Sequence, residues 1–130
     1  MELLVPVSPG ELLDKLTILD IKLRHIDDAE KLANVRREHE LLGRVWQEAG
    51  LEAPRLGSLR AELLNVNQRL WQIEDDIRDC EREGRFDEAF ISLARSVYIE
   101  NDRRAALKRE INRLLGSKIV EEKSYARYRG

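Results

Sequence analysis

Two sets of polar side chains in this chain have the spacing and the chemistry of a binding or catalytic site. The first recurs at intervals of four and three residues, which places its members on one face of a helix: Asn67, Trp71, Glu74 and Arg78. The second stands in a later segment, where an apolar helical repeat is interrupted: Tyr98, Asn101, Asp102, Lys108 and Asn112. If the two helices form a hairpin, these sets face each other across a polar pocket.

In that pocket, Glu74 or Asp102 would act as an acid, a base or an anion-pairing group. The cations that could bind a carboxylate or phosphate are Arg78, Arg103 and Lys108. The same residues also have a structural interpretation, because buried asparagines and ion pairs fix the register of packed helices. Acid-first pairs four residues apart, such as Glu74 with Arg78 and Glu100 with Arg104, are typical of solvated helix faces. The sequence leaves pocket and network as alternatives.

A second candidate lies near the beginning of the chain, where polar groups are dense among aliphatic ones. Asp14 and Thr17 share one helix face, and Lys15 and Lys22 share another, so part of this helix could line a cleft. The amides at the helix start, residues 8–10, could also receive an anion beside Lys15.

No motif of an established reaction class accompanies these residues. His25 and His39 are the only histidines, and neither has a second ligand at metal-binding spacing. The acidic run of residues 74–79 lacks the paired acidic motifs of all-helical nucleotide pyrophosphohydrolases. Neither a glycine-rich phosphate loop nor a serine nucleophile elbow is present. We therefore expect a non-catalytic protein without metal or cofactor.

The composition narrows the class of partner. The chain has 130 residues, of which 37% are charged and 5% aromatic, a balance that suits long amphipathic helices. A net charge of −2, with both signs interspersed, argues against nucleic acid and against an anionic membrane surface. No stretch has the length and hydropathy of a membrane span or a signal peptide. We expect a cytoplasmic protein with one cysteine, Cys80, packed as a small apolar residue.

The elements that position these residues are predicted to be four helices. Apolar residues spaced by fours and threes, together with helix caps, place the helices at about 9–26, 28–49, 59–83 and 88–115. The predicted caps are Ser8, Gly50, Ser58, Gly84 and Asp87. Short connections predict antiparallel hairpins in an elongated, coiled-coil-like four-helix bundle, with a single domain over residues 1–130. The N-terminal residues, and residues 117–125 packed back on the bundle, are predicted to be extended, and residues 126–130 to be a loose end.

Extended strings of residues also carry a resemblance. They are PVSPGELLDKLTILDIK at residues 6–22, GSKIVEEKSY at residues 116–125, and three shorter strings at residues 32–38, 70–75 and 101–103. Over nearly its whole length the chain resembles a small family of uncharacterised bacterial proteins, catalogued as a domain of unknown function. The resemblance implies no established activity, only an association with surface-polysaccharide and glycosyltransferase functions. The polar residues inside these strings add weight to the suspected cleft: Glu11, Asp14, Lys15, Asp20, Lys22, Glu74, Asn101, Asp102 and Glu122.

Two functional hypotheses follow. The first is a non-catalytic helical-bundle protein that works by association, as a homo-oligomer such as a dimer or with a protein partner, accessory to surface-polysaccharide biosynthesis. The second is a protein or enzyme that binds a sugar nucleotide, phosphate or carboxylate in a pocket between helices.

Overall fold

A computed structural model describes residues 1–128 of the chain. It contains four helices: α1 (Pro9–His25), α2 (Ala29–Ala49), α3 (Leu56–Glu83) and α4 (Glu88–Leu114). No strand occurs over this range, so the predicted all-α class is confirmed. Residues 1–7 and 117–128 have no helix, and of the predicted loose end, residues 129 and 130 lie outside the described part.

Most helix ends follow local side-chain chemistry. The side-chain oxygens of Ser8, Asp28 and Asp87 each accept a hydrogen bond from a backbone N–H three residues on. Gly50 and Gly84 follow α2 and α3 with φ of 60° and 64°, a conformation that glycine adopts without a Cβ penalty.

The beginning of α3 differs from the prediction. Ser58 does not cap this helix, which starts three residues before the predicted position 59, after Arg55, which makes no side-chain cap hydrogen bond. Leu56 packs against the central apolar cluster, so burial extends the helix by nearly one turn beyond the polar cap.

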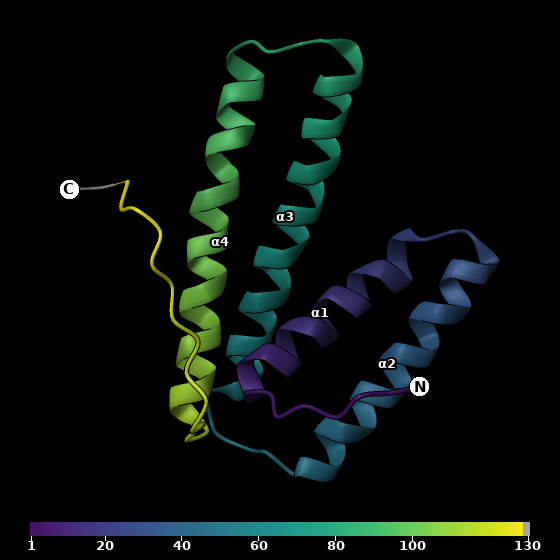
Figure 1. The fold of residues 1–130 in the computed structure, drawn as a ribbon, viewed down its shortest axis with the longest axis vertical. Coiled ribbons are helices and arrows are strands. Elements are labelled where there is room, and N and C mark those ends of the chain that lie inside the picture. The colour runs from purple at the N-terminus through teal and green to yellow at the C-terminus, as the bar shows by residue number, and fades with distance from the viewer. Residues whose placement is uncertain (129–130) are drawn as a thin grey trace.

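The helices form two antiparallel hairpins, α1–α2 and α3–α4, as predicted (Figure 1). α1 lies across the lower part of the α3–α4 hairpin and contacts both of its helices, while α2 packs along α1. The central cluster is built from all three of α1, α3 and α4: Leu13, Leu59, Leu63 and Ile111. Trp46 of α2 packs against this cluster, which lies where α3 begins and α4 ends.

The upper part of the α3–α4 hairpin extends beyond α1 and α2 (Figure 1). We call residues 72–83 of α3 and 88–98 of α4 the distal hairpin. Its helices pack on one another, and Ile91 is 54% exposed. Tyr98, at its lower edge, is 40% exposed and contacts Tyr128. None of the helices is, over the described residues, both long and apolar enough to cross a membrane.

Candidate functional site

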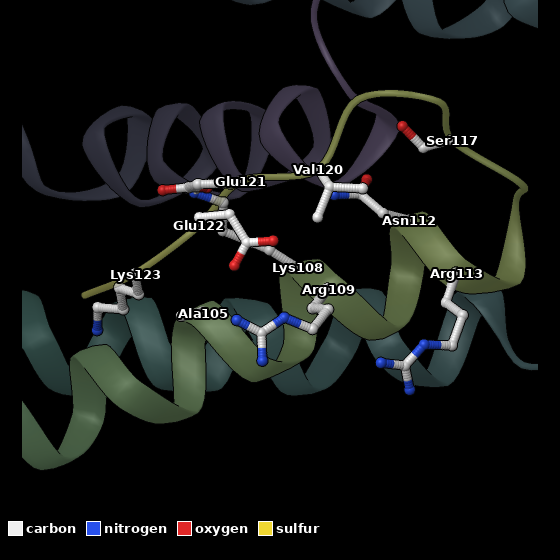
Figure 2. A pocket seen from close by; sticks show the side chains of 10 residues that line it. All are labelled: Ala105, Lys108, Arg109, Asn112, Arg113, Ser117, Val120, Glu121, Glu122 and Lys123. Atoms are coloured by element: carbon white, nitrogen blue, oxygen red, sulfur yellow. The ribbon is translucent and has the colours of Figure 1, made fainter. Parts of the chain in front are cut away.

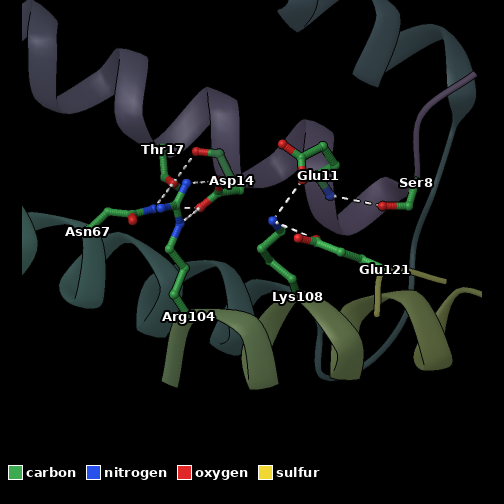
Figure 3. A network of polar contacts seen from close by, with 8 residues as sticks. All are labelled: Ser8, Glu11, Asp14, Thr17, Asn67, Arg104, Lys108 and Glu121. Carbon is green, nitrogen blue, oxygen red and sulfur yellow. Dashed lines mark hydrogen bonds and ion pairs between the residues drawn. The ribbon is translucent and has the colours of Figure 1, made fainter. Parts of the chain in front are cut away.

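A buried carboxylate joins α1 to the α3–α4 hairpin. Asp14 of α1 is 1% exposed and accepts two hydrogen bonds from Arg104 of α4, Nε to Oδ1 at 2.9 Å and Nη2 to Oδ2 at 2.5 Å. Asn67 of α3 donates from Nδ2 to the same Oδ1 at 2.9 Å and to the Thr17 hydroxyl at 3.0 Å. Thr17 in turn donates to the Asp14 carbonyl at 2.7 Å. Figure 3 shows that these side chains converge from three helices.

This network is chemically closed. Both carboxylate oxygens of Asp14 are engaged, and the hydrogen bonds from Arg104 raise the pKa of that guanidinium above its ordinary value. A fork of two parallel N–H donors fixes the orientation of a carboxylate. The arrangement supports the structural interpretation, in which polar groups fix how the helices dock, because no oxygen of Asp14 is left to meet a substrate.

A second cluster centres on Lys108 of α4. Its Nζ lies 2.7 Å from Oε2 of Glu11 and 2.9 Å from Oε2 of Glu121, and its side chain is 11% exposed (Figure 3). Burial lowers the pKa of Lys108, but the contacts with the two carboxylates outweigh burial, so the pKa is raised above 10.5. Lys108 is therefore a structural cation and not a base at neutral pH.

Beside Lys108, the backbone at the start of α1 lies close to the backbone of α4. The Gly10 amide donates to Oδ1 of Asn112 at 2.7 Å. A Cβ at Gly10 would lie 2.5 Å from the Lys108 carbonyl oxygen, so only glycine allows α1 to start this close to α4.

The C-terminal segment, residues 117–128, runs along α4. Besides Glu121 on Lys108, its Lys123 lies 2.9 Å from Oδ1 of Asp102, and this hydrogen bond lowers the pKa of Asp102 below its ordinary value. The Tyr128 ring packs on Tyr98 with centroids 4.9 Å apart. The prediction of an extended segment packed back on the bundle describes residues 117–125 well. The predicted loose end is wrong at Tyr128, which packs on α4.

Among the surface hollows that border the segment, two have a volume of about 360 Å³ each. The first is polar and lies between α1, α4 and the segment, with a lining that includes Glu11, Asn101, Arg104, Lys108, Glu121 and Lys123. The second runs between α4 and the segment, beside Arg109, Arg113, Val120 and Glu122 (Figure 2). The cations of the first hollow already have partners within the chain, since Arg104 is bound to Asp14, Lys108 to Glu11 and Glu121, and Lys123 to Asp102.

The predicted stripes of α3 and α4 do not face each other. Asn67 belongs to the Asp14 network, and the Trp71 ring stacks on His25 of α1 with centroids 5.4 Å apart. Glu74 and Arg78 form a mutual ion pair at 3.5 Å on the surface, with side chains 53% and 78% exposed. The remaining candidates lie elsewhere, with Lys15 on the exposed Glu38 and Glu122 in the second hollow.

The correction has a clear physical reason. Apolar residues such as Leu63 fill the contact between α3 and α4, so the polar side chains point away from it, toward α1, the C-terminal segment or the surface. Glu74 and Asp102, which were expected to share a pocket, therefore have separate partners, Arg78 and Lys123.

The interpretation of Glu100 and Arg104 as a solvated surface pair is wrong. Glu100 is 8% exposed and pairs with Arg69 and Arg103, whereas Arg104 reaches Asp14. The sequence contains a signal that residues 100 and 104 face inward. The apolar repeat Phe90, Leu93, Val97 continues at steps of three and four residues onto positions 100, 104, 107 and 111. Thr17 was predicted to share a helix face with Asp14, whereas Glu121 and Lys123 were absent from the predicted site, and no periodicity marks these two.

The part of the chain that the structure describes contains no group of three histidine, cysteine, aspartate or glutamate side chains placed to hold a metal ion. No curated protein and no solved structure matches the chain. A family model described as a family of unknown function (DUF6165) matches residues 3–128.

Proposed function

Since the chain belongs to DUF6165, a family whose function is unknown, we propose a role from its own geometry: a non-catalytic protein that associates with another protein chain through the distal hairpin. The closed Asp14 network and the paired cations around Lys108 support the non-catalytic part of this proposal. Groups of these types would be the ones to carry a reaction, and here each is engaged in docking α1 or the C-terminal segment.

One observation carries the associative part. Residues 89–99 of α4 include one charged side chain, Arg95, and seven apolar ones besides Tyr98, so this stretch has the composition of a helix that is covered on more than one side. In the folded chain it packs on α3, while Ile91 remains 54% exposed. Apolar surface left exposed on such a helix is what a partner chain would cover.

The test compares two single substitutions of exposed apolar residues. Ile91→Asp places a charge on the distal hairpin, and Val45→Asp places one on α2, where Val45 is 46% exposed. Tagged wild type and both variants are expressed in the organism that encodes the chain, and the native mass of each particle is measured by light scattering. We expect a particle larger than 15.2 kDa for wild type and Val45→Asp and its loss for Ile91→Asp. A 15.2 kDa monomer in all three would contradict the proposal.

A second candidate function is the binding of a small polar ligand in the first hollow. The observation that favours it is Asn101, whose half-buried amide lines the hollow and has no hydrogen-bond partner among residues 1–128. Because the nearby cations are already paired, the hollow fits a neutral, hydroxyl-rich molecule better than a free anion. A thermal-shift screen with sugars, sugar phosphates and nucleotides tests this, since ligand at 100 times its Kd adds about 2.7 kcal/mol to the free energy of unfolding.

The gain should be lost in Asn101→Ala and kept in Asn65→Ala, which changes an exposed asparagine on α3. No shift with any of these ligands would leave the hollow as a structural feature. The accessory role in surface-polysaccharide biosynthesis stays a prediction of the resemblance. Unchanged surface polysaccharide in a deletion strain would contradict it.

A further inference from the structure

We infer that a hollow on the α3–α4 hairpin binds a phosphate group, free or as a small monoester, between Arg69 of α3 and Arg103 of α4. The lining of this hollow, over residues 1–128, includes no residue of the distal hairpin or of the C-terminal segment, so the inference goes beyond the proposed function and is independent of it. It is carried by an excess of positive charge in a cluster that a buried carboxylate holds together.

The hollow lies on the side of the hairpin that faces away from α1. Its volume is about 390 Å³, and α3 and α4 both contribute to it. On α3, Asn67 binds Asp14 of α1. Asn65 and Arg69, which line the hollow, lie two positions to either side of Asn67, about 200° around the helix. Since no described residue of α1 or α2 belongs to the lining, this side of the hairpin is open to a ligand.

A buried carboxylate of α4 holds two arginines at one end of this hollow. Glu100 is 8% exposed, and its Oε1 accepts a hydrogen bond from Nη1 of Arg103 at 3.2 Å. Its Oε2 lies 3.4 Å from Nε of Arg69. Because one carboxylate contacts both, the two guanidinium groups lie beside each other, one from each helix. The Arg69 and Arg103 side chains are still 53% and 59% exposed, so both can reach a ligand in the hollow.

The charges of this cluster do not balance. Two guanidinium groups share one carboxylate, and within residues 1–128 neither arginine is paired with another acidic side chain. By contrast, Lys108 lies between two carboxylates, and Arg104 is bound to Asp14. A net positive charge therefore remains beside Arg69 and Arg103, and a bound anion would neutralise it.

Glu62 limits where in the hollow an anion can bind. It lines the same hollow but lies seven residues before Arg69, which is about 10 Å along α3. Its carboxylate repels an anion at its own end of the hollow. The end formed by Arg69 and Arg103 is therefore the favourable position.

Both arginines keep hydrogen-bond donors for a ligand. A guanidinium group carries five N–H donors in one plane. Among the described residues, the side chain of Arg103 uses only Nη1, and that of Arg69 makes no hydrogen bond, since Oε2 of Glu100 accepts none. Glu100 thus brings the two groups together by charge and leaves most of their donors available.

The number of acceptor oxygens favours phosphate over carboxylate as the ligand. A carboxylate has two oxygens and matches one guanidinium fork, whereas a phosphate monoester has three terminal oxygens and can accept from two forks. Its charge of about −1.5 to −2 at neutral pH also exceeds that of a carboxylate. A phosphate group between Arg69 and Arg103 would therefore use donors from both helices.

Isothermal titration calorimetry at constant ionic strength tests the site with inorganic phosphate, glycerol phosphate and acetate as probes. We expect saturable binding of phosphate at a single site in each chain and no saturable binding of acetate. Tighter binding of glycerol phosphate would identify a small monoester as the source of the phosphate group. Tighter binding of inorganic phosphate would identify the free anion.

Changes of arginine to lysine test the donors without removing charge. Arg69→Lys and Arg103→Lys keep a cation beside Glu100 but lose the planar fork. Each should weaken phosphate binding by roughly tenfold, while the helical circular dichroism signal stays that of wild type. Arg78→Lys is the matched control on α3, because this exposed arginine is paired with Glu74 alone, and it should bind phosphate like wild type.

Two further variants locate the site. Glu62→Gln removes a repulsive charge from the hollow and should bind phosphate at least as tightly as wild type. Asn101→Ala, which changes the first hollow beside the C-terminal segment, should leave phosphate binding unchanged. Loss of phosphate binding in Asn101→Ala would place the anion there and overturn the inference.

The inference would also be overturned if wild type showed no saturable binding of phosphate. Unchanged binding in both Arg69→Lys and Arg103→Lys, or equally weakened binding in Arg78→Lys, would show that these two arginines form no site. Acetate binding as tight as phosphate binding would overturn the class of ligand. None of these outcomes involves Ile91, on which the test of the proposed association depends.

Discussion

The Asp14 carboxylate is buried away from water, and it is stable there because Arg104 and Asn67 donate hydrogen bonds to its oxygens. Removing one partner of a buried pair leaves the other uncompensated, which costs more than the pair contributes. For Asp14→Ala we expect a loss of about 3 kcal/mol in the free energy of unfolding, since Arg104 remains partly hydrated. Urea unfolding followed by circular dichroism measures it.

Glu74→Ala is the comparison, because it removes a carboxylate from an exposed ion pair on α3. Such pairs contribute about 0 to 1 kcal/mol, so this variant should unfold almost like wild type. Equal losses in Asp14→Ala and Glu74→Ala would show that Asp14 does not hold the helices together.

We expect the change of glycine to alanine to have opposite effects on stability at two positions. Gly10→Ala sets a methyl group 2.5 Å from a backbone oxygen that cannot move aside, and we expect a loss of about 1 to 3 kcal/mol. Gly43→Ala lies within α2 with nothing near its Cβ, so the better helix propensity of alanine should add about 1 kcal/mol. Thermal and urea unfolding give both signs, and a stabilising Gly10→Ala would contradict the close packing of α1 on α4.

For single residues, the sequence predicted which polar side chains take part in networks better than it predicted their partners. Asn67, Lys108, Glu11 and Asp14 were all candidates, and the structure places each in a network between helices. What could not be derived is which helix each one faces, because that depends on how α1 crosses the α3–α4 hairpin. Arg104 was missed although its register position was readable, because an acid four residues earlier gave it a plausible surface partner.

Among the elements, the C-terminal segment is attached by charged side chains and should respond to pH. Lys108 has a raised pKa in the folded chain, so its contribution to stability is complete below its ordinary value of 10.5 and is lost as pH rises through the raised value. We expect the difference in unfolding free energy between wild type and Lys108→Met to be constant at neutral pH and to shrink at alkaline pH. Lys15→Met, which removes an exposed ion pair, is the matched control for the change of lysine to methionine.

The helices themselves were largely predictable. Polar caps and left-handed glycines set most of their ends, and local chemistry of this kind is visible in a single sequence. The start of α3 was predicted three residues too late, because burial of Leu56, a tertiary effect, overrides the preference of Ser58 for a cap position. The two hairpins followed from short connections, whereas the path of α1 over α3 and α4 required the coordinates.

In the whole molecule, packing is uneven, with the apolar cluster at one end and the distal hairpin at the other. Backbone amides of residues 74–83 and 88–98 should therefore exchange with solvent faster than those around Leu59 and Leu63 in a dilute sample. In the particle isolated from the native organism, we expect protection to increase in the distal hairpin and to stay constant in α2. Hydrogen exchange with mass spectrometry resolves these segments, and a uniform response would contradict association through the distal hairpin.

The contacts of Asp14 also constrain the order in which the molecule can be made. Its partners Asn67 and Arg104 follow it by 53 and 90 residues, and the partner of the Gly10 amide, Asn112, also comes late in the chain. On the ribosome, the first helix must remain undocked until most of the chain has emerged, while each hairpin can close from neighbouring residues. A nascent chain of this protein therefore carries an unsatisfied helix for nearly the whole of its synthesis, and stalled or shortened products should be the forms that chaperones and proteases recognise.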